Sequence, residues 1–305
     1  MEDVEGKVAF ITGGSSGIGR GIAVAFARAG MRVVISGRRQ EHIDESLAQF
    51  AGLGLDVDAV TLDVTDRAAV ERAAEETERR HGAVHVLVNN AGIGLAGPVA
   101  AATEGDWDWL IDVNIKGVAH GIQAFLPRIR AHGEGGHIVT TSSMGGLLPV
   151  VAGLYSMTKA AVIALSEALH IELAPEGIGV SAYCPGPVHS NIASGVTQRP
   201  AAYAGTGYAP PDPARLAAAA SAPYMSAIEA GERVLEGVRR NDLFILTHPE
   251  FRDGVRERFD TILAAFPDEP VDQVRAAAIP FLTSHAVYAP ENRLPPPRLT
   301  ADELR

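Results

Sequence analysis

A tyrosine and a lysine, Tyr155 and Lys159, stand four positions apart at the head of the segment "LYSMTKAAVIALSEALHIELA". Residues i and i+4 of a helix lie on the same face, so a helix here places a phenol beside an ammonium group. Such a pair can exchange a proton with a bound substrate. The same spacing also fits a tyrosine packed in the core and a lysine whose ammonium group reaches water. The choice depends on whether the rest of the chain supplies a cofactor for the pair.

A glycine-rich segment, "ITGGSSGIGRG", follows the first apolar run and precedes a helical pattern. Gly13 would permit a tight turn, Gly17 the close approach of the backbone to a pyrophosphate, and Gly19 the close packing of helix on strand. Ser15 and Ser16 add hydroxyl or backbone donors. Phosphates would then lie at the amino end of the helix, where free N–H groups and the macrodipole favour anions. The segment predicts a dinucleotide-binding site.

Short β-branched runs alternate with helical patterns along most of the chain. Strands separated by single helices need right-handed crossovers, which produce a parallel sheet covered on both faces. We therefore expect an α/β fold, a single doubly wound parallel sheet of about seven strands with helices on both faces. The expected strands are 7–12, 32–36, 57–64, 84–90, 137–142, 179–184 and 243–248. The expected helices cover the segment after the glycines, roughly 40–51, 66–80 and 106–131, the Tyr155 segment, and roughly 225–240.

Seven motifs occur along the chain in one order. They are T-G-x-x-x-G-x-G from Thr12 to Gly19, "LDV" with Asp63, "NNAG" at 89–92, "DVNIKG" with Asn114, "TTSS" at 140–143, Y-x-x-x-K at 155–159 and "PGPV" at 185–188. With this ordered set, the chain resembles the short-chain dehydrogenases/reductases from residue 7 to about residue 250. The resemblance implies a Rossmann fold and an NAD(P)-dependent oxidoreductase that interconverts a secondary alcohol and a ketone.

The resemblance also implies a role for each of four catalytic residues. Tyr155 exchanges the proton with the substrate oxygen, and Lys159 holds the cofactor ribose. Ser143 hydrogen-bonds the substrate oxygen, and Asn114 anchors a water that relays protons to Lys159. The ordinary pKa of a phenol is near ~10, and Lys159 together with an oxidised nicotinamide is expected to lower it.

The polarising serine has two candidates. Counting back thirteen residues from Tyr155 lands on Ser142, whereas aligning the strand end lands on Ser143. Adjacent residues of a strand point to opposite faces, so only one of the two can face the substrate. A loop loses a residue more easily than a strand changes its register, which favours Ser143.

Further cofactor contacts follow from the resemblance. The segment after the sixth strand would hold the nicotinamide carboxamide, with a serine in place of the usual threonine. The "NNAG" segment would line the adenosine ribose and pyrophosphate, and Asp63 would accept from the adenine amino group. The full expected cofactor-binding set is Gly13, Ser15, Ser16, Gly17, Ile18, Gly19, Arg38, Asp63, Val64, Asn90, Ala91, Gly92, Tyr155, Lys159, Pro185, Gly186, Val188 and Ser190.

The end of the second strand, "VVISGRRQEH", bears on the choice of cofactor. NAD-preferring members carry an acidic side chain here, which accepts from the ribose 2′-hydroxyl. This chain has Gly37 at that position, followed by Arg38 and Arg39. A guanidinium can bind a 2′-phosphate with charge assistance, and no carboxylate repels it. Although Ser16 stands where many NADP-binding members have a second basic residue, we expect NADP, with NAD as the alternative.

Two segments interrupt the strand–helix alternation. Residues 190–224, rich in Gly, Pro, Ala and Tyr, are expected to form a substrate lid on a catalytic domain of residues 1–266. Residues 267–305 form a Pro-rich extension expected along the surface or on a partner subunit. The lid and the following segment resemble bacterial dehydrogenases that oxidise the benzylic alcohol of lignin-type aryl ethers, which are generally NAD-linked. Tyr203, Tyr208 and Tyr224 are expected either to offer flat apolar walls to an aromatic ketone or to pack the lid itself.

The composition of the chain argues against several classes of binding partner. A net charge of −11 and a pI near 5.4 argue against nucleic acid and anionic membranes. Cys184 is the single cysteine, so neither an intrachain disulfide nor a cysteine cluster can form, and the ten histidines show no zinc spacing, so no metal is expected. We expect a cytoplasmic homodimer or homotetramer acting on a small molecule. An epimerase or dehydratase and a nucleotide-sensing protein on the same fold remain alternatives.

Overall fold

The computed structural model describes residues 1–149, 152–203, 207–210, 212–283, 285–289 and 295. The described residues divide into two compact units, one covering residues 1–248 and one beginning at Pro249. The second unit therefore begins before the boundary expected at residue 266. The other residues of the expected lid (204–206 and 211) and of the expected C-terminal extension (284, 290–294 and 296–305) lie outside the described structure.

The first unit is built on one sheet of seven parallel strands in the order β3-β2-β1-β4-β5-β6-β7. The expected doubly wound α/β sheet is confirmed. The strands are β1 (Val8–Ile11), β2 (Arg32–Gly37), β3 (Val57–Thr61), β4 (Val86–Asn89), β5 (Gly136–Thr141), β6 (Ile178–Cys184) and β7 (Phe244–Leu246).

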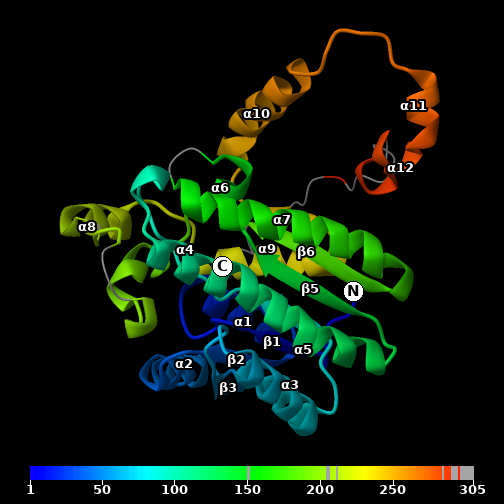
Figure 1. Ribbon diagram of the computed structural model, residues 1–305. Helices are drawn as coiled ribbons and strands as arrows, with labels where there is room; N and C mark the ends of the chain where they lie inside the picture. The colour runs from blue at the N-terminus through cyan, green and yellow to red at the C-terminus, as the bar shows by residue number, and fades with distance from the viewer. Residues whose placement is uncertain (150–151, 204–206, 211, 284, 290–294, 296–305) are drawn as a thin grey trace. The chain divides into compact units, whose positions relative to one another are not determined.

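Helices cover both faces of the sheet (Figure 1). The alternating side chains of the buried strands point to opposite faces, which produces two separate apolar cores. One core packs Phe10 and Leu87 against α3 (Arg67–His81), α5 (Gly117–Ala131) and α7 (Gly153–Leu173). The other packs Ile11 and Val88 against α1 (Gly17–Arg28), α2 (Gln40–Gly52) and α9 (Ala227–Arg240).

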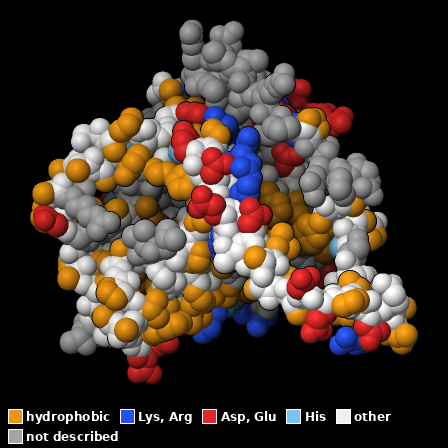
Figure 2. Space-filling model, turned by 90° about the horizontal axis from the view of Figure 1, so that it is seen from above, with side chains coloured by type: hydrophobic (Ala, Val, Ile, Leu, Met, Phe, Trp, Pro, Cys, Tyr) orange, Lys and Arg blue, Asp and Glu red, His pale blue; other side chains and the backbone are white. Residues whose placement is uncertain are grey.

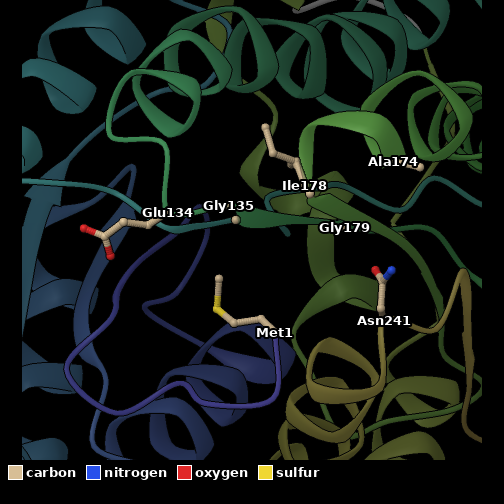
Figure 3. Close-up of a pocket in the computed structure, with 9 residues that line it drawn as sticks. Met1, Glu134, Gly135, Ala174, Ile178, Gly179 and Asn241 are labelled. Atoms are coloured by element: carbon tan, nitrogen blue, oxygen red, sulfur yellow. The ribbon is translucent and has the colours of Figure 1, made fainter.

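The strand order reverses direction between β1 and β4, and the crevice at such a switch point is where ligands bind in open α/β sheets. The glycine-rich turn follows β1, "NNAG" ends β4, the two serines follow β5, and "PGPV" follows β6. All these segments therefore meet at the carboxyl edge of the sheet. A cavity of about 190 Å³ lies instead at the amino ends of β5 and β6, lined by Gly135, Ile178 and Asn241 among others (Figure 3). It is separate from the predicted site.

The helical region expected at 106–131 is interrupted. It consists of α4 (Glu104–Ile111), a π-helical turn (Asp112–Lys116) and α5. The backbone N–H of Gly117 bonds the carbonyl of Asp112, five residues back, so the turn holds one residue more than an α-helical turn. The periodicity of the sequence did not reveal this extra residue. The turn carries Asn114, and π turns of this kind are frequent at functional sites.

The expected lid contains more local structure than its composition predicted. It holds two 3₁₀ turns (Ile192–Gln198 and Ala201–Tyr203) and the alanine-rich helix α8 (Pro213–Ser221), and an isolated bridge pairs Val188 with Met225.

The second unit contains α10 (Arg252–Ala264), α11 (Gln273–Ala278) and α12 (Pro280–Thr283). None of the described residues of α10 and α11 is buried. Ile262, Leu263 and Phe266 of this unit are exposed. Figure 2 shows hydrophobic side chains at several places on this face of the molecule and a group of acidic and basic side chains near the centre of the view. The packing of residues 267–305 along the surface or on a partner subunit stays a prediction.

Candidate active site

The glycine-rich turn has the conformation that its residue types predict. Gly13 and Gly17 have φ of 65° and 51°, a region that other residues rarely adopt. Thr12 holds the turn to the strand beside it, because its hydroxyl accepts from the backbone N–H groups of Asn90 and Ala91 at 2.9 and 3.0 Å. The Asn90 amide in turn donates to the carbonyls of Thr12 and Gly13. The Asn90 side chain is thus engaged within the protein and holds the turn in place.

The amino end of α1 leaves donors available for a phosphate. Ser16 occupies the N-cap position, and its side chain makes no capping hydrogen bond. The first N–H groups of the helix, from Gly17 onward, therefore face outward with the positive end of the helix dipole. A Cβ on Gly17 would lie 2.9 Å from the Cβ of Ser190, so only a glycine lets the segment after β6 lie over this turn. A dinucleotide's pyrophosphate fits these donors.

Tyr155 lies half-buried in the first turn of α7, beside the two serines that follow β5. The Ser142 hydroxyl is buried and donates to the carbonyl of Lys159 at 2.7 Å. The Ser143 hydroxyl accepts from the N–H of Gly145 at 3.0 Å, and it lies close enough to the Tyr155 phenol to favour the phenolate and so oppose the rise in the pKa of Tyr155. The structure therefore brings Ser143 to the phenol and uses Ser142 to hold α7 against β5.

The protein's own residues raise the pKa of Tyr155, because burial disfavours the phenolate more strongly than the Ser143 hydroxyl favours it. The sequence led us to expect a lowered pKa with Lys159 and an oxidised nicotinamide beside the phenol. The lysine ammonium lies 5.6 Å from the centre of the tyrosine ring and donates to the carbonyl of Thr141 at 2.8 Å. It is therefore near the phenol but is not bonded to it.

Lys159 itself is almost fully buried, and this burial lowers its pKa to about 8. A buried ammonium is stable only when it has acceptors, and the Thr141 carbonyl supplies one. Its two other N–H groups remain available for acceptors such as ribose hydroxyls.

The Asn114 amide is held at three points within the structure. Its oxygen accepts from the N–H of Ile93 at 2.9 Å, and its nitrogen donates to the carbonyl of Ile93 at 3.0 Å and to the hydroxyl of Thr158 at 3.1 Å. A Cβ on Gly92 would lie 3.3 Å from the Asn114 amide oxygen and 3.4 Å from the Lys159 nitrogen. The amide oxygen and the ammonium therefore both face Gly92, and a side chain at this position would press on both.

The adenosine end of the site lies at the carboxyl end of β2. Gly37 is buried, and a Cβ there would lie 2.5 Å from the Ser15 hydroxyl. Ser15 thus occupies the place where an acidic side chain at position 37 would have to begin. Arg38 is exposed and donates to the carbonyl of Gln198 at 3.1 Å. The Asp63 carboxylate accepts from the backbone and hydroxyl of Thr65, and these bonds fix it at the end of β3.

The segment after β6 is held by backbone bonds. Pro185 accepts from the N–H of Met144, and Gly186 donates to the hydroxyl of Thr247. Val188 is buried and pairs with Met225. The segment is therefore fixed beside the serines, as a contact with the nicotinamide end requires.

Sequence reasoning missed the residues that anchor the lid. Arg199 forms an ion pair with Asp106, which is fully buried at the start of α4, and its guanidinium lies 5.1 Å from the Trp109 ring. Tyr203 donates to the Asp112 carboxylate at 2.9 Å. A capping signature around Asp106 is visible in the sequence, but nothing there links it to an arginine 93 residues away. Tyr203 and the buried Tyr208 therefore pack and anchor the lid segment, the second of the two roles considered for these tyrosines.

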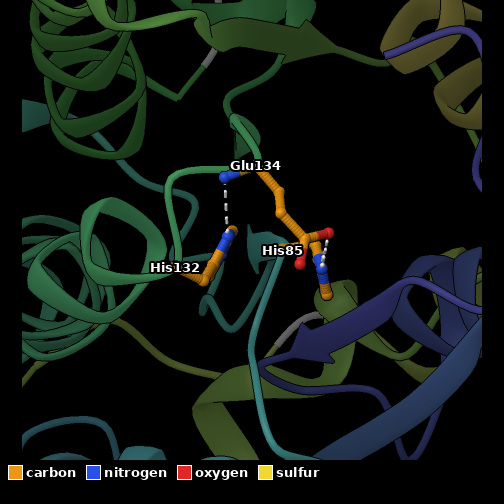
Figure 4. A group of neighbouring side chains, drawn as sticks. All are labelled: His85, His132 and Glu134. Atoms are coloured by element: carbon orange, nitrogen blue, oxygen red, sulfur yellow. Dashed lines mark hydrogen bonds and ion pairs between the residues drawn. The ribbon is translucent and has the colours of Figure 1, made fainter.

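A cluster of His85, His132 and Glu134 lies at the amino edge of the sheet, with ligand atoms within 4.8 Å of one another (Figure 4). Nδ1 of His85 accepts from the N–H of Val8, and Nδ1 of His132 accepts from the N–H of Glu134. The remaining nitrogen of each ring therefore carries the proton and faces an oxygen, that of Glu134 or of Val84. With both lone pairs used by backbone N–H groups, the cluster acts as a structural tie between β1, β4 and the turn after α5.

Comparison with known proteins supports this picture. Residues 7–201 match the family model described as short chain dehydrogenase. The chain belongs to the short-chain dehydrogenase family. This dehydrogenase is 40% identical over 268 residues to the C alpha-dehydrogenase of Sphingobium sp. (strain NBRC 103272 / SYK-6), covering 86% of this chain and 87% of the relative.

Solved structures place the dehydrogenase in the same family. A short chain dehydrogenase/reductase from Burkholderia phymatum in complex with NAD is 34% identical, with a TM-score of 0.79, covering 89% of this chain and all of that one. LigO from Sphingobium sp. strain SYK-6, in the apo form, is 36% identical, with a TM-score of 0.75, covering 93% and 98% of the two chains. The chain is therefore an NAD(P)-dependent oxidoreductase that acts on alcohol groups. Among its described residues, no helix is long and apolar enough to span a bilayer.

Proposed function

We propose that this dehydrogenase interconverts a bulky secondary alcohol, apolar or aromatic, and its ketone, with NADP(H) as the hydride carrier. The observation that carries the proposal is the group of Ser143, Tyr155 and Lys159 at the carboxyl edge of the sheet, next to the glycine turn that fits a dinucleotide. When bound, the nicotinamide would accept or supply the hydride.

The residues of the chain supply the proton chemistry. The Ser143 hydroxyl lies near the Tyr155 phenol, so both groups can hydrogen-bond the oxygen of an alcohol or ketone bound beside them. The phenol donates its proton to that oxygen in ketone reduction and takes it back in alcohol oxidation. Lys159 supplies positive charge near the phenol, and a water or ribose hydroxyl beside Gly92 would bridge Lys159 and Asn114. A proton can then pass between the site and the Ile93–Asn114 side of the sheet.

The preference for NADP rests on the end of β2. No carboxylate can stand at position 37 without displacing Ser15, and the exposed guanidinium of Arg38 can reach a 2′-phosphate. NAD binds the Burkholderia phymatum relative, and NAD is the alternative for this chain.

The proposal of an aromatic substrate rests on two resemblances, that of the segment after β6 and that of the whole chain to a named relative. The segment after β6 resembles that of aryl-ether benzylic alcohol dehydrogenases, and one relative with 40% identity is named C alpha-dehydrogenase. An alcohol on the carbon next to an aromatic ring fits both. The oligomeric state, which we propose to be a homodimer or homotetramer, and a cytoplasmic location stay predictions.

A panel of aryl and alkyl ketones with NADPH or NADH tests the proposal, with absorbance of the reduced nicotinamide as the readout. We expect turnover with aryl ketones, faster with NADPH, and at least a hundredfold loss of kcat in Tyr155→Phe with little change in cofactor Kd. A Tyr155→Phe variant that retains more than a tenth of the parent's kcat would contradict the catalytic assignment. An epimerase or dehydratase would consume substrate without a change in nicotinamide absorbance, and a nucleotide-sensing protein would bind cofactor without turnover.

A further inference from the structure

The carboxylate of Asp112 ties the π-helical turn that carries Asn114 to the loop expected to cover the substrate. The Asp112 carboxylate opens the turn, and its two oxygens bond Lys116 at 2.7 Å and the Tyr203 hydroxyl at 2.9 Å. Lys116 is the last residue of the same turn, whereas Tyr203 belongs to the loop between β6 and α9. The loop expected to cover the substrate therefore contacts the element that aims Asn114.

A π turn needs such support, because it contains one residue more than the α-helix around it. Each residue of a helix rotates the chain by about 100° around the helix axis. If the π turn became an ordinary α-helical turn, the Asn114 side chain would therefore point in a different direction. Asn114 is aimed correctly only while its amide spans the N–H and carbonyl of Ile93 and reaches Thr158. Contacts that hold the turn therefore also hold the amide.

Tyr203 is itself held firmly against α4. Its ring stacks on Trp109, with centroids 6.2 Å apart and planes 24° apart, and the Trp109 side chain is fully buried. Arg199, in the same loop, forms an ion pair with the buried Asp106, and its guanidinium also lies over the Trp109 ring. The hydroxyl of Tyr203 is thus placed by packing, so its bond to Asp112 is a directed contact.

We propose that Tyr203 is a positioning residue for the reaction. It ties the substrate loop to the π turn and so keeps Asn114 in register with Lys159. The inference rests on the proposed function, because it assigns Asn114 to proton movement in that site. It adds a link between the loop that covers the substrate and the residue that relays the proton.

The test compares Tyr203→Phe with Tyr208→Phe. Each variant removes one hydroxyl from the same loop, but the Tyr208 hydroxyl donates to the carbonyl of Pro98, which lies outside the π turn. Phenylalanine keeps the stack on Trp109 in the first variant. We expect hydrogen exchange of the amides at 112–117 to rise about three- to tenfold in Tyr203→Phe, the effect of one hydrogen bond, and to stay unchanged in Tyr208→Phe. Equal exchange in the two variants would overturn the proposal.

Kinetics give the second readout. Tyr203→Phe should lower kcat about three- to tenfold, with KM for the ketone and Kd for the cofactor within about twofold of the parent. In an Asn114→Ala background the same change should have no further effect on kcat, because the residue it positions is gone. Additive losses would show that Tyr203 acts by another route and would overturn the proposal. The exchange measurement needs no turnover, so an enzyme inactive on every ketone would refute the proposed function and leave this test intact.

Discussion

We expect the proposed preference for NADP to be reversible at the end of β2, but not by substituting Gly37 alone. Gly37→Asp would introduce the carboxylate that accepts from a ribose 2′-hydroxyl. Its Cβ would lie 2.5 Å from the Ser15 hydroxyl and 3.0 Å from the Ser15 Cβ, closer than side chains tolerate. Ser15 belongs to the glycine turn, and its carbonyl accepts from Ser46 at 2.9 Å. A displaced Ser15 would disturb the pyrophosphate site, so both cofactors should bind more weakly.

Removing the Ser15 side chain relieves this contact. We expect the parent to bind NADPH more tightly than NADH by on the order of 1.5–3 kcal/mol, the effect of one charge-assisted contact set, or roughly ten- to more than a hundredfold in Kd. Arg38→Ile should remove most of that difference by weakening NADPH alone. Gly37→Asp with Arg38→Ile should reverse the order at a loss of affinity, and adding Ser15→Gly should restore tight binding of NADH.

Titration of both reduced cofactors, followed by their fluorescence at two salt concentrations, measures these constants. The preference should shrink as salt rises, because the Arg38 guanidinium is exposed and an exposed pair is screened. Arg39→Ile is the matched control, since that guanidinium lies 3.2 Å from Nδ1 of His42 at the start of α2. Tighter binding of NADH by the parent, or equal effects of Arg38→Ile and Arg39→Ile, would refute the reasoning and favour NAD as the cofactor.

Three further predictions concern Lys159, Gly92 and His137. Lys159→Ala should weaken cofactor binding as well as kcat, and calorimetry showing an unchanged Kd would mean that Lys159 does not hold the ribose. Gly92→Ala should lower kcat about tenfold or more with an unchanged melting temperature, since its methyl would press on the Asn114 oxygen and the Lys159 nitrogen; a variant with the parent's kcat would contradict this. The pKa of His137 is about 3 because the ring is buried, below its ordinary value near 6.5, so its stabilising contribution is complete above pH 6.5 and is lost as pH falls toward 3. Denaturant titrations of His137→Leu should therefore show a slope of stability against pH smaller by up to about 1.4 kcal/mol per pH unit in that range, and an unchanged slope would exclude His137 as the cause.

The sequence predicted the sheet and the placement of its motifs well, because both depend on local patterns. Strand and helix periodicities are properties of a few consecutive residues, and parallel crossovers leave little choice of topology. The carboxyl ends of parallel strands meet at one edge, so motifs that follow four different strands come together without further information.

Choosing between the two serines depended on backbone detail that spacing does not contain. The strand β5 ends at Thr141, and both serines follow it. Ser143 then caps the short helix α6 (Met144–Leu147) with extended φ and ψ of −170° and 157°. This conformation turns its hydroxyl toward Tyr155, whereas Ser142 turns inward to bond Lys159. An argument from strand register favoured the same residue, although the serines lie just beyond the strand.

The surface on which the loop after β6 packs could not be predicted from the sequence. It is formed by glycines, and their role depends on residues that are distant in the sequence. A Cβ on Gly94 would lie 2.9 Å from the Ile192 side chain, and one on Gly97 would overlap the Tyr208 ring. A Cβ on Gly105 would lie 3.2 Å from the carbonyl of the 3₁₀ turn above it. In the sequence Gly94 and Gly97 look like ordinary turn residues between β4 and α4, and Gly105 looks like an ordinary residue of the first turn of α4. Because these glycines have no side chains, a loop about a hundred residues later in the chain can pack directly against the backbone of this segment. The loop is therefore positioned by the absence of side chains beneath it as well as by the ion pair and aromatic stack at its end, and a larger residue at Gly94 or Gly97 would press against it.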